Sequence, residues 1–419
     1  MSETHVERRA RLMGPNVPTF YRSPVHLVRG EGVWLWDAAG KRYLDCYNNV
    51  PHVGHCHPKV VEAIAKQAAT LNTHTRYLHD MVLDYLERLL GTFKNGIGQG
   101  ILTCTGSEAN DIALRMAQAA TGKTGIIVTD DTYHGNTTAV SQLSARRPQI
   151  GERWPNVRLV PAPNSLLRPD PDGTIFAGHV KAAMAELAAA GFGTSALLIC
   201  PMFANEGLPS LAPGWLAPTE AALRAEGALI IADEVQPGFG RSGSHFWGHE
   251  RLGFKADIVT MGKPMGNGHP VAAVVTTPEI MASFRNVFSY FNTFGGNPVS
   301  AAAAMAVLQV IEEEGLQERA AKSSAYVKDR LEALNHPLIA DVRANGLFFA
   351  VELRDGDKGA TAFSVQLVEN MVARGFLMNV IGADRNVLKI RPPMAFDIEH
   401  ADLLIDALAA ALAETKVPA

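Results

Sequence analysis

A lysine and a carboxylate follow two predicted core strands, and together they could hold an aldehyde cofactor. Residues 229–232 and 258–260 are short apolar runs, the pattern of strands buried on both faces. Asp233 follows the first run directly, and Lys263 follows the second within a glycine-rich loop. Ligands bind at the carboxyl ends of strands in open α/β sheets, so we expect both groups at one site. Pyridoxal phosphate requires such a pair, because a lysine amine forms a Schiff base with its aldehyde and a carboxylate keeps its pyridine nitrogen protonated.

A glycine turn before a predicted helix offers a place for a phosphate group. Thr105 and Glu108 have the spacing of a capping box, and apolar residues follow at helical spacing. Between them lie Gly106 and Ser107, whose backbone N–H groups would face a ligand at the positive end of the helix dipole. The alternative is a helix cap without a ligand. The presence of Lys263 in the same chain favours phosphate binding.

The segment DEVQPGFGRSG at residues 233–243, followed by the glycine-flanked Lys263, resembles the class III aminotransferases, a group of fold-type-I pyridoxal phosphate (PLP) enzymes. The resemblance runs from about Gly30 to the C-terminus. It implies an α/β fold with a mostly parallel seven-stranded sheet in a large domain. A small α+β domain made from both chain ends would complete the molecule.

The domain boundaries can be placed on the sequence. We expect an N-terminal arm and hairpin over residues 1–57, the large PLP-binding domain over residues 58–314, and the C-terminal part of the small domain over residues 315–419. The hairpin is predicted from apolar residues that alternate around the DAAG turn at residues 37–40.

The resemblance implies a role for each residue of the cofactor site. Lys263 would bind the aldehyde and act as general base, and Asp233 would pair with the pyridine nitrogen. Thr293 would reach the phosphate of the neighbouring subunit's cofactor, which implies a homodimer. The other implied cofactor contacts are Gly106 and Ser107 at the phosphate, Tyr133 stacked on the ring with His134 beside it, Val235 under the ring and Gln236 at the phenolic oxygen. An ordinary half-buried tyrosine is the alternative for Tyr133.

Four residues are candidates for contact with the substrate. Arg391 stands where the family has a carboxylate-binding arginine, and a guanidinium binds a carboxylate through two parallel hydrogen bonds. Tyr47 and Asn49 lie in a polar turn and could line the pocket. Asn205 replaces a glutamate that in many members pairs with that arginine, so this charge pair cannot form. Glu206 is displaced by one position and is expected to point elsewhere. The alternatives are that Arg391 has only a structural role and that Tyr47 and Asn49 only form a turn.

Other motifs resemble the phospholyase branch of the same family, which eliminates phosphate and ammonia from phosphorylated amino alcohols such as phosphoethanolamine or phosphohydroxylysine. They are YLDCYNNVPHVGHCHP at residues 43–58, RYLHD at residues 76–80 and YFNTFGGNP at residues 290–298. Arg391 favours an aminotransferase that moves an amino group from an amine or amino acid to a 2-oxo acid, because the phospholyases carry lysine there. We predict the aminotransferase, with the phospholyase as the alternative. A catalytically silent dimer is disfavoured, because Lys263 and the acid are both present.

Composition gives no sign of a nucleic-acid or membrane partner, and the resemblance implies small-molecule amine and 2-oxo acid substrates. The formal net charge is −4 and no basic block occurs, so neither nucleic acid nor an anionic membrane surface is implied. The four cysteines form no CxxC pair, the N-terminus lacks a signal-peptide core, and no run of eighteen apolar residues occurs. We therefore expect a cytoplasmic enzyme.

A histidine-rich segment raises the question of a metal site. His52, His55, Cys56 and His57 lie within six positions, but no matching cluster of ligands occurs elsewhere in the sequence. The segment is also similar to a turn of the family, so we expect a turn and no metal.

Overall fold

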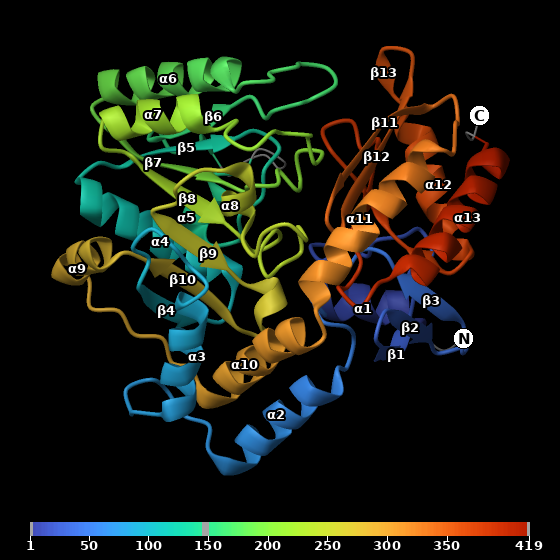
Figure 1. Cartoon of the computed structure of the whole chain (residues 1–419), viewed down its shortest axis with the longest axis horizontal. Helices are drawn as coiled ribbons and strands as arrows, with labels where there is room; N and C mark the ends of the chain where they lie inside the picture. Colours follow the sequence, from blue (N-terminus) through green and yellow to red (C-terminus); the bar gives the residue numbers. More distant parts are fainter. Residues whose placement is uncertain (1–2, 145–150, 417–419) are drawn as a thin grey trace.

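A seven-stranded sheet forms the centre of the larger part of the molecule (Figure 1). The computed structural model describes residues 3–144 and 151–416. Every strand runs in the same direction except β10, which is antiparallel to both of its neighbours, so the predicted mostly parallel sheet is confirmed. In spatial order the strands are β4 (Gln99–Thr103), β10 (Ala272–Thr276), β9 (Ile258–Met261), β8 (Leu229–Asp233), β7 (Thr194–Ile199), β5 (Gly125–Thr129) and β6 (Val157–Val160).

Helices cover both faces of this sheet, which explains why its central strands are apolar throughout. Side chains alternate between the faces of a strand. In β5, Ile126 and Val128 therefore pack in one layer and Ile127 in the other. Helices α4 (Gly106–Thr121) and α9 (Pro278–Val287) belong to the first layer, and α6 (Thr174–Ala189) and α7 (Ala217–Ala225) to the second.

A helical group packs beside the sheet. Helix α10 (Pro298–Glu313) contacts α2 (Pro58–Thr70), α3 (Asp80–Leu90) and the short 3-10 helix η1 (Lys263–Gly266). The remaining helices before α10 are α1 (His5–Met13), α5 (Thr138–Ser141) and α8 (Gly248–Leu252).

The smaller part of the molecule is built from both ends of the chain, as predicted (Figure 1). One sheet joins β1 (Leu27–Glu31), β2 (Trp34–Asp37) and β3 (Arg42–Asp45) to β14 (Phe376–Leu377). A second has the order β11–β12–β16–β15, with β13 paired to β12; these strands are β11 (Ile339–Asn345), β12 (Phe348–Asp355), β13 (Lys358–Gly359), β15 (Asn379–Ile381) and β16 (Val387–Ile390). Helices α11 (Leu316–Glu332), α12 (Thr361–Ala373) and α13 (Ile398–Glu414) complete it. The domain division at residues 57 and 314 stays a prediction.

One local element was predicted from the sequence and another was not. The hairpin is confirmed, because β2 and β3 pair in antiparallel register around residues 38–41. Strand β6, which pairs in parallel with β5 at the edge of the sheet, was not predicted from the sequence. A four-residue strand is too short to show a clear period in the sequence.

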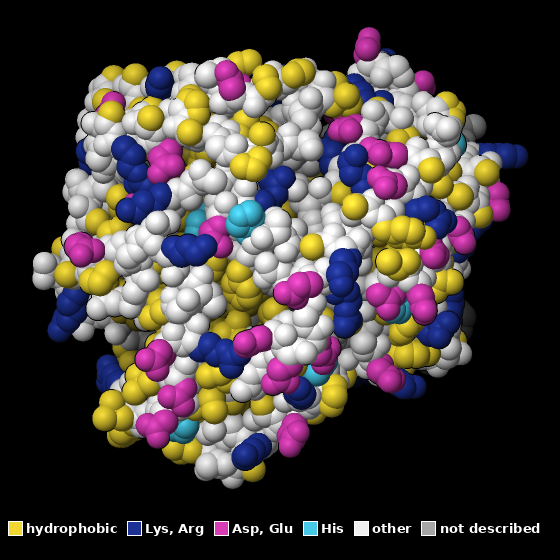
Figure 2. Space-filling view, in the orientation of Figure 1, with side chains coloured by type: hydrophobic (Ala, Val, Ile, Leu, Met, Phe, Trp, Pro, Cys, Tyr) yellow, Lys and Arg dark blue, Asp and Glu magenta, His cyan; other side chains and the backbone are white. Residues whose placement is uncertain are grey.

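Charged side chains of both signs are interspersed over the face shown in Figure 2. This distribution agrees with the small net charge of −4. None of the helices within residues 3–144 and 151–416 is long and apolar enough to cross a membrane.

Candidate active site

Lys263 and Asp233 line one cavity at the carboxyl end of the central strands. Asp233 ends β8, and η1 begins at Lys263, two residues after the neighbouring strand β9. The cavity has a volume of about 350 Å³. Every predicted cofactor residue except Thr293 lies in its wall: Gly106, Ser107, Tyr133, His134, Asp233, Val235, Gln236 and Lys263. Their roles at the cofactor stay proposals, but their convergence on one cavity agrees with the prediction.

A network of buried polar groups fixes the carboxylate of Asp233. Its Oδ2 accepts a hydrogen bond from Nδ2 of Asn110 at 3.0 Å and lies 2.7 Å from Nδ1 of His134. Its Oδ1 accepts the backbone N–H of Val235 at 3.0 Å. Thr260 in turn donates to Oδ1 of Asn110 at 2.7 Å, which orients the amide. Sequence analysis missed Asn110, although a lone asparagine on the apolar face of α4 was a usable signal.

The environment of Lys263 favours its neutral amine. Burial and the nearby charge of Arg391 lower the pKa of Lys263, while the charge of Asp233 opposes this shift. A lysine with a lowered pKa presents more of the unprotonated form that attacks an aldehyde or accepts a proton from carbon.

The turn before α4 has the capped, glycine-dependent geometry that was predicted for it. The predicted capping box is present, since Thr105 accepts the N–H of Glu108 and Glu108 accepts the N–H of Thr105. A Cβ at Gly106 would lie 2.9 Å from Val235. Gly135 has φ +144°, and a Cβ there would lie 2.6 Å from Oγ of Ser107. Only glycine fits these two contacts. The glycine turn before α4, the buried carboxylate of Asp233 and the amine of Lys263 are the groups that PLP needs, so these residues fit the cofactor.

Two buried cations converge on one neutral amide beside this cavity. Oε1 of Gln236 accepts a hydrogen bond from Nζ of Lys389 at 2.9 Å and another from Nη1 of Arg391. Their other hydrogen-bond acceptors are backbone carbonyls, those of Ala204 for Lys389 and Tyr47 for Arg391. Because Oε1 of Gln236 faces the cations, its amide nitrogen is the atom left to donate to a cofactor oxygen.

Lys389 was missed by sequence analysis, although it stands two residues before Arg391. Burial, followed by the charge of Arg391, lowers the pKa of Lys389 strongly. Burial also lowers the pKa of Arg391. Both shifts express the cost of holding positive charge away from water, which the nearby charges of Glu206 at Lys389 and of Asp45 at Arg391 offset only in part.

The other predicted substrate residues lie around this cluster. Tyr47 contributes its backbone carbonyl to Arg391, and its ring lies 5.4 Å from the guanidinium carbon. Asn49 is buried, and its Oδ1 has no hydrogen-bond partner among residues 3–144 and 151–416. Asn205 is held at the small domain, because its carbonyl accepts the N–H of Gly382 at 3.2 Å. The structure therefore brings Tyr47 to Arg391. None of the four predicted substrate residues is among those that line the Lys263 cavity, and Gln236 is the cavity residue that contacts Arg391.

The histidine-rich turn connects the two domains near Arg391. Nε2 of His52 lies 2.8 Å from the carbonyl of Phe239, and its Nδ1 lies 3.1 Å from Nη2 of Arg241. Arg241 also donates to the carbonyl of Pro392 at 2.6 Å, next to Arg391. Within the described residues, no group of three or more histidine, cysteine or acidic side chains is arranged to hold a metal ion.

Comparison with known proteins gives the family. The model described as "Aminotransferase class-III" matches residues 18–412. The chain belongs to the class III aminotransferase family. Enzymes of this family depend on PLP, and this chain carries the residues that fit it. Bound PLP withdraws electrons from the carbon next to the substrate nitrogen, so that a bond at that carbon can break.

Relatives in the family carry two kinds of name. The "Alanine--glyoxylate aminotransferase 2-like" protein of Drosophila melanogaster is 40% identical, over 95% of this chain and 84% of its own length. The "Ethanolamine-phosphate phospho-lyase homolog 1" of Caenorhabditis elegans is 34% identical, over 94% and 90%. An Arthrobacter phospholyase solved in complex with phosphoethanolamine is 44% identical, with a TM-score of 0.95 and coverage of 99% and 100%. A Bacillus anthracis aminotransferase is 26% identical, with a TM-score of 0.84 and coverage of 93% of each chain.

Proposed function

We propose that this enzyme is a PLP-dependent phospholyase that releases phosphate and ammonia from a phosphorylated amino alcohol of the phosphoethanolamine type. The observation that carries the proposal is the cation pair of Lys389 and Arg391, which share a neutral acceptor on Gln236. This preference differs from the one drawn from the sequence, where Arg391 was considered without Lys389.

The charge of the cluster suits a phosphate ester better than a carboxylate. The hydrogen-bond acceptors of Lys389 and Arg391 are all neutral, so positive charge on these buried side chains is costly until an anion arrives. A phosphate monoester carries about −1.5 to −2 charges at neutral pH, whereas a carboxylate carries only one. Asn205 also removes the glutamate that would neutralise Arg391 in gated relatives. The likeness to the Arthrobacter phospholyase, at 44% identity over nearly both full chains, supports the same choice.

The residues of the site have clear tasks in such an elimination. The amine of Lys263 would take the proton from the carbon that bears the amino group. The C–O bond at the adjacent carbon then breaks, and phosphate leaves with the bonding electron pair. One water molecule is consumed as ammonia and an aldehyde are released, so phosphoethanolamine would give acetaldehyde. The cluster of Lys389 and Arg391 would stabilise the charge that collects on the departing phosphate.

Amino transfer to a 2-oxo acid is the second candidate. Arg391 has the fork geometry that binds a carboxylate, and the Drosophila melanogaster relative carries an aminotransferase name. Two assays separate the candidates. One offers phosphoethanolamine and phosphohydroxylysine without an acceptor and measures phosphate and ammonia; the other offers amines with pyruvate or 2-oxoglutarate and measures new amino acid. The proposal expects product in the first, and product only in the second would overturn it.

A homodimer is the assembly that the surface supports. Thr293 is exposed and does not line the Lys263 cavity of its own chain. Its neighbour Phe294 is 70% exposed and Leu78 is 95% exposed. Exposed apolar side chains of this size are typical of a surface that another chain covers. We propose that Thr293 serves the cofactor of the partner subunit. A cytoplasmic location stays a prediction.

A further inference from the structure

The RYLHD segment at residues 76–80 has no task in the reaction proposed above. In the structure it begins in the loop between α2 and α3, where Arg76, Tyr77 and Leu78 are all exposed. Tyr77 is 67% exposed and Leu78 is 95% exposed. Large apolar side chains in such a position are typical of a covered surface, and arginine and tyrosine are enriched in protein interfaces. The loop therefore belongs to the surface proposed above as the contact between subunits.

This loop and the loop that carries Thr293 form one continuous surface. The guanidinium carbon of Arg76 lies 3.9 Å from the centre of the Phe291 ring, and Phe291 stands two residues before Thr293. The ring of His74 stacks on Tyr77 at 5.1 Å and meets the Phe291 ring edge-on at 5.7 Å. Residues of both loops line a common cavity of about 480 Å³. Arg76 and Thr293 are therefore presented to the same neighbour.

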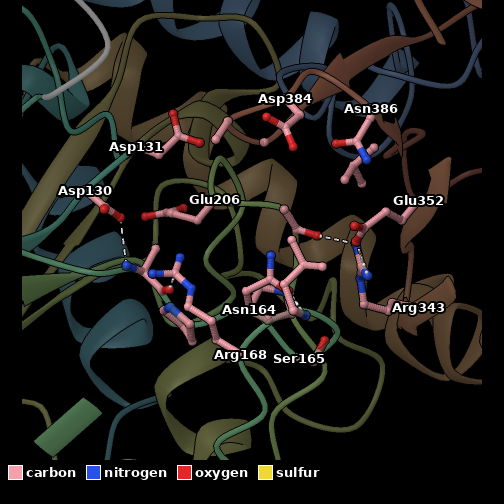
Figure 3. A pocket seen from close by; sticks show the side chains of 18 of the residues that line it. Asp130, Asp131, Asn164, Ser165, Arg168, Glu206, Arg343, Glu352, Asp384 and Asn386 are labelled. Atoms are coloured by element: carbon pink, nitrogen blue, oxygen red, sulfur yellow. Dashed lines mark hydrogen bonds and ion pairs between the residues drawn. The ribbon is translucent and has the colours of Figure 1, made fainter. Parts of the chain in front are cut away.

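The guanidinium of Arg76 has no acid to pair with in its own chain. It lies over the Phe291 ring, and within residues 3–144 and 151–416 no carboxylate is within ion-pair distance of it. The face of a ring attracts the positive charge but leaves the N–H donors free for an anion. In the second cavity, of about 280 Å³, Arg343 instead contacts Glu352 at 2.8 Å (Figure 3). Many exposed arginines are only solvated, and what distinguishes Arg76 is its place on the surface that carries Thr293.

Two-fold symmetry would bring this surface to the cofactor site of the partner. Two identical subunits related by a two-fold axis join the same patch of both chains. The Thr293 loop also packs beside the phosphate turn of its own chain. Nδ2 of Asn292 donates to Oε1 of Glu108 in the capping box at 3.3 Å, and a Cβ at Gly295 would lie 2.6 Å from a carbonyl oxygen of β4. With Thr293 at the partner's cofactor, this loop lies between the two cofactor sites, and Arg76 lies at the edge of the second.

The Lys263 cavity has no further lysine or arginine of its own for a substrate phosphate. Among the described residues that line it, Lys263 is the one lysine or arginine, and its amine is needed for the aldehyde of the cofactor. Lys389 and Arg391 approach from the side of Gln236. A phosphate ester offers three strong acceptor oxygens, and a guanidinium binds such oxygens through two parallel hydrogen bonds. A guanidinium from the partner would therefore complete the binding of a substrate phosphate.

We propose that Arg76 enters the active site of the partner subunit and binds the phosphate group of the substrate there. The inference rests on the proposed phospholyase function and on the proposed dimer contact through Thr293. The two residues serve different phosphate groups. Thr293 serves that of the cofactor, which the whole family uses, whereas Arg76 belongs to a motif that resembles the phospholyase branch. Each Arg76 thus acts in the site that is built around the other subunit's lysine.

Mixed dimers test the proposal, because they separate a residue that acts in its own chain from one that acts in the partner. Chains with Arg76→Met and chains with Lys263→Ala carry different affinity tags, and two successive affinity steps isolate the mixed dimer. One of its sites then combines the native Lys263 of the first chain with the native Arg76 of the second. We expect this dimer, at a phosphoethanolamine concentration below KM, to release phosphate at half the rate of the native dimer.

The parent dimers and a control give the reference values. Lys263→Ala should release no phosphate. Arg76→Met should show a kcat/KM about tenfold or more below the native value, the loss expected for a charge-assisted hydrogen bond, with PLP retention after dialysis unchanged. Arg168→Met is the matched control. Arg168 is another exposed arginine, on the wall of the cavity in Figure 3, and its replacement should leave kcat/KM at the native value.

Four results would overturn the proposal. A mixed dimer no more active than the Arg76→Met dimer would show that Arg76 acts in its own chain. A native kcat/KM in Arg76→Met would remove it from the site. Lost PLP with unchanged use of phosphoethanolamine would assign it to the cofactor phosphate, and failure of Arg76→Met to dimerise in light scattering would assign it to the subunit contact. A native enzyme that releases no phosphate is a separate result, because it refutes the proposed function itself, and this inference falls with it.

Discussion

Lys389 and Arg391 stand two residues apart at the end of β16 and donate hydrogen bonds to the same oxygen of Gln236. Alternate residues of a strand point to the same face, which is why both cations reach one amide. The backbone N–H of Arg391 is held by the carbonyl of Cys46 at 2.7 Å, so the N-terminal part of the small domain fixes the pair. The end of β16 therefore supplies both basic side chains beside the cavity.

Replacing Lys389 with Met should weaken phosphate recognition. A charge-assisted hydrogen bond is worth about 1.5–3 kcal/mol, and each 1.4 kcal/mol is about tenfold. We expect kcat/KM for phosphoethanolamine to fall about tenfold or more, because the cluster loses one positive charge. Steady-state phosphate release measures the change. Lys328→Met, at an exposed lysine, is the matched control and should leave kcat/KM for phosphoethanolamine unaltered. An unchanged kcat/KM in a folded Lys389→Met enzyme would remove this cluster from substrate recognition.

Cofactor labelling should select Lys263. Limiting PLP followed by borohydride reduction is expected to mark Lys263 before exposed lysines such as Lys59, as peptide mapping will show. Burial lowers the pKa of Lys263, so its amine loses its proton at a lower pH than a free amine does. A hydrogen bond to Glu313 raises the pKa of Lys59, so Lys59 stays protonated to a higher pH. Lowering the pH through the mildly alkaline range should therefore slow the labelling of Lys59 more than the labelling of Lys263. Stable modification of another lysine, with Lys263 unmodified, would contradict the assignment.

Thr293→Ala should weaken cofactor retention without breaking the dimer. The reason is that Thr293 is proposed to donate to the phosphate of the cofactor bound in the partner subunit, while the surrounding apolar surface holds the subunits together. PLP absorbance after dialysis and light scattering measure the two properties, with Thr70→Ala as an exposed control. A fully active monomer, or PLP retention equal to that of the native enzyme, would show that Thr293 has no such role.

Sequence alone sufficed where function depends on local pattern. The apolar runs before Asp233 and Lys263 located two strand ends, and parallel strands bring such ends to one edge of a sheet. The capping box of Thr105 and Glu108 was equally local, since its two partners are three residues apart. These features indicated the cofactor and one sheet edge for its site, whereas the seven-stranded sheet was implied by the family resemblance.

The remaining features depend on contacts between distant segments. Glu206 lies in a turn where Phe203 has φ +45°, a bend that no motif indicates, and its carboxylate accepts a hydrogen bond from Thr129, 77 positions away in the chain. Lys389 meets Gln236 from 153 positions away in the chain. A lysine and an arginine spaced two apart in a predicted strand share a face, and that spacing was the one signal for the cluster.

Turnover of phosphoethanolamine in the absence of any 2-oxo acid tests the central claim most directly. The enzyme, loaded with PLP, is mixed with an excess of phosphoethanolamine, and phosphate, ammonia and acetaldehyde are measured over time. The proposed elimination needs no acceptor, so it predicts many turnovers with the three products in equal amounts. An aminotransferase would stop once its cofactor had accepted the amino group, after no more than one equivalent per site and without phosphate. That result would contradict the phospholyase assignment.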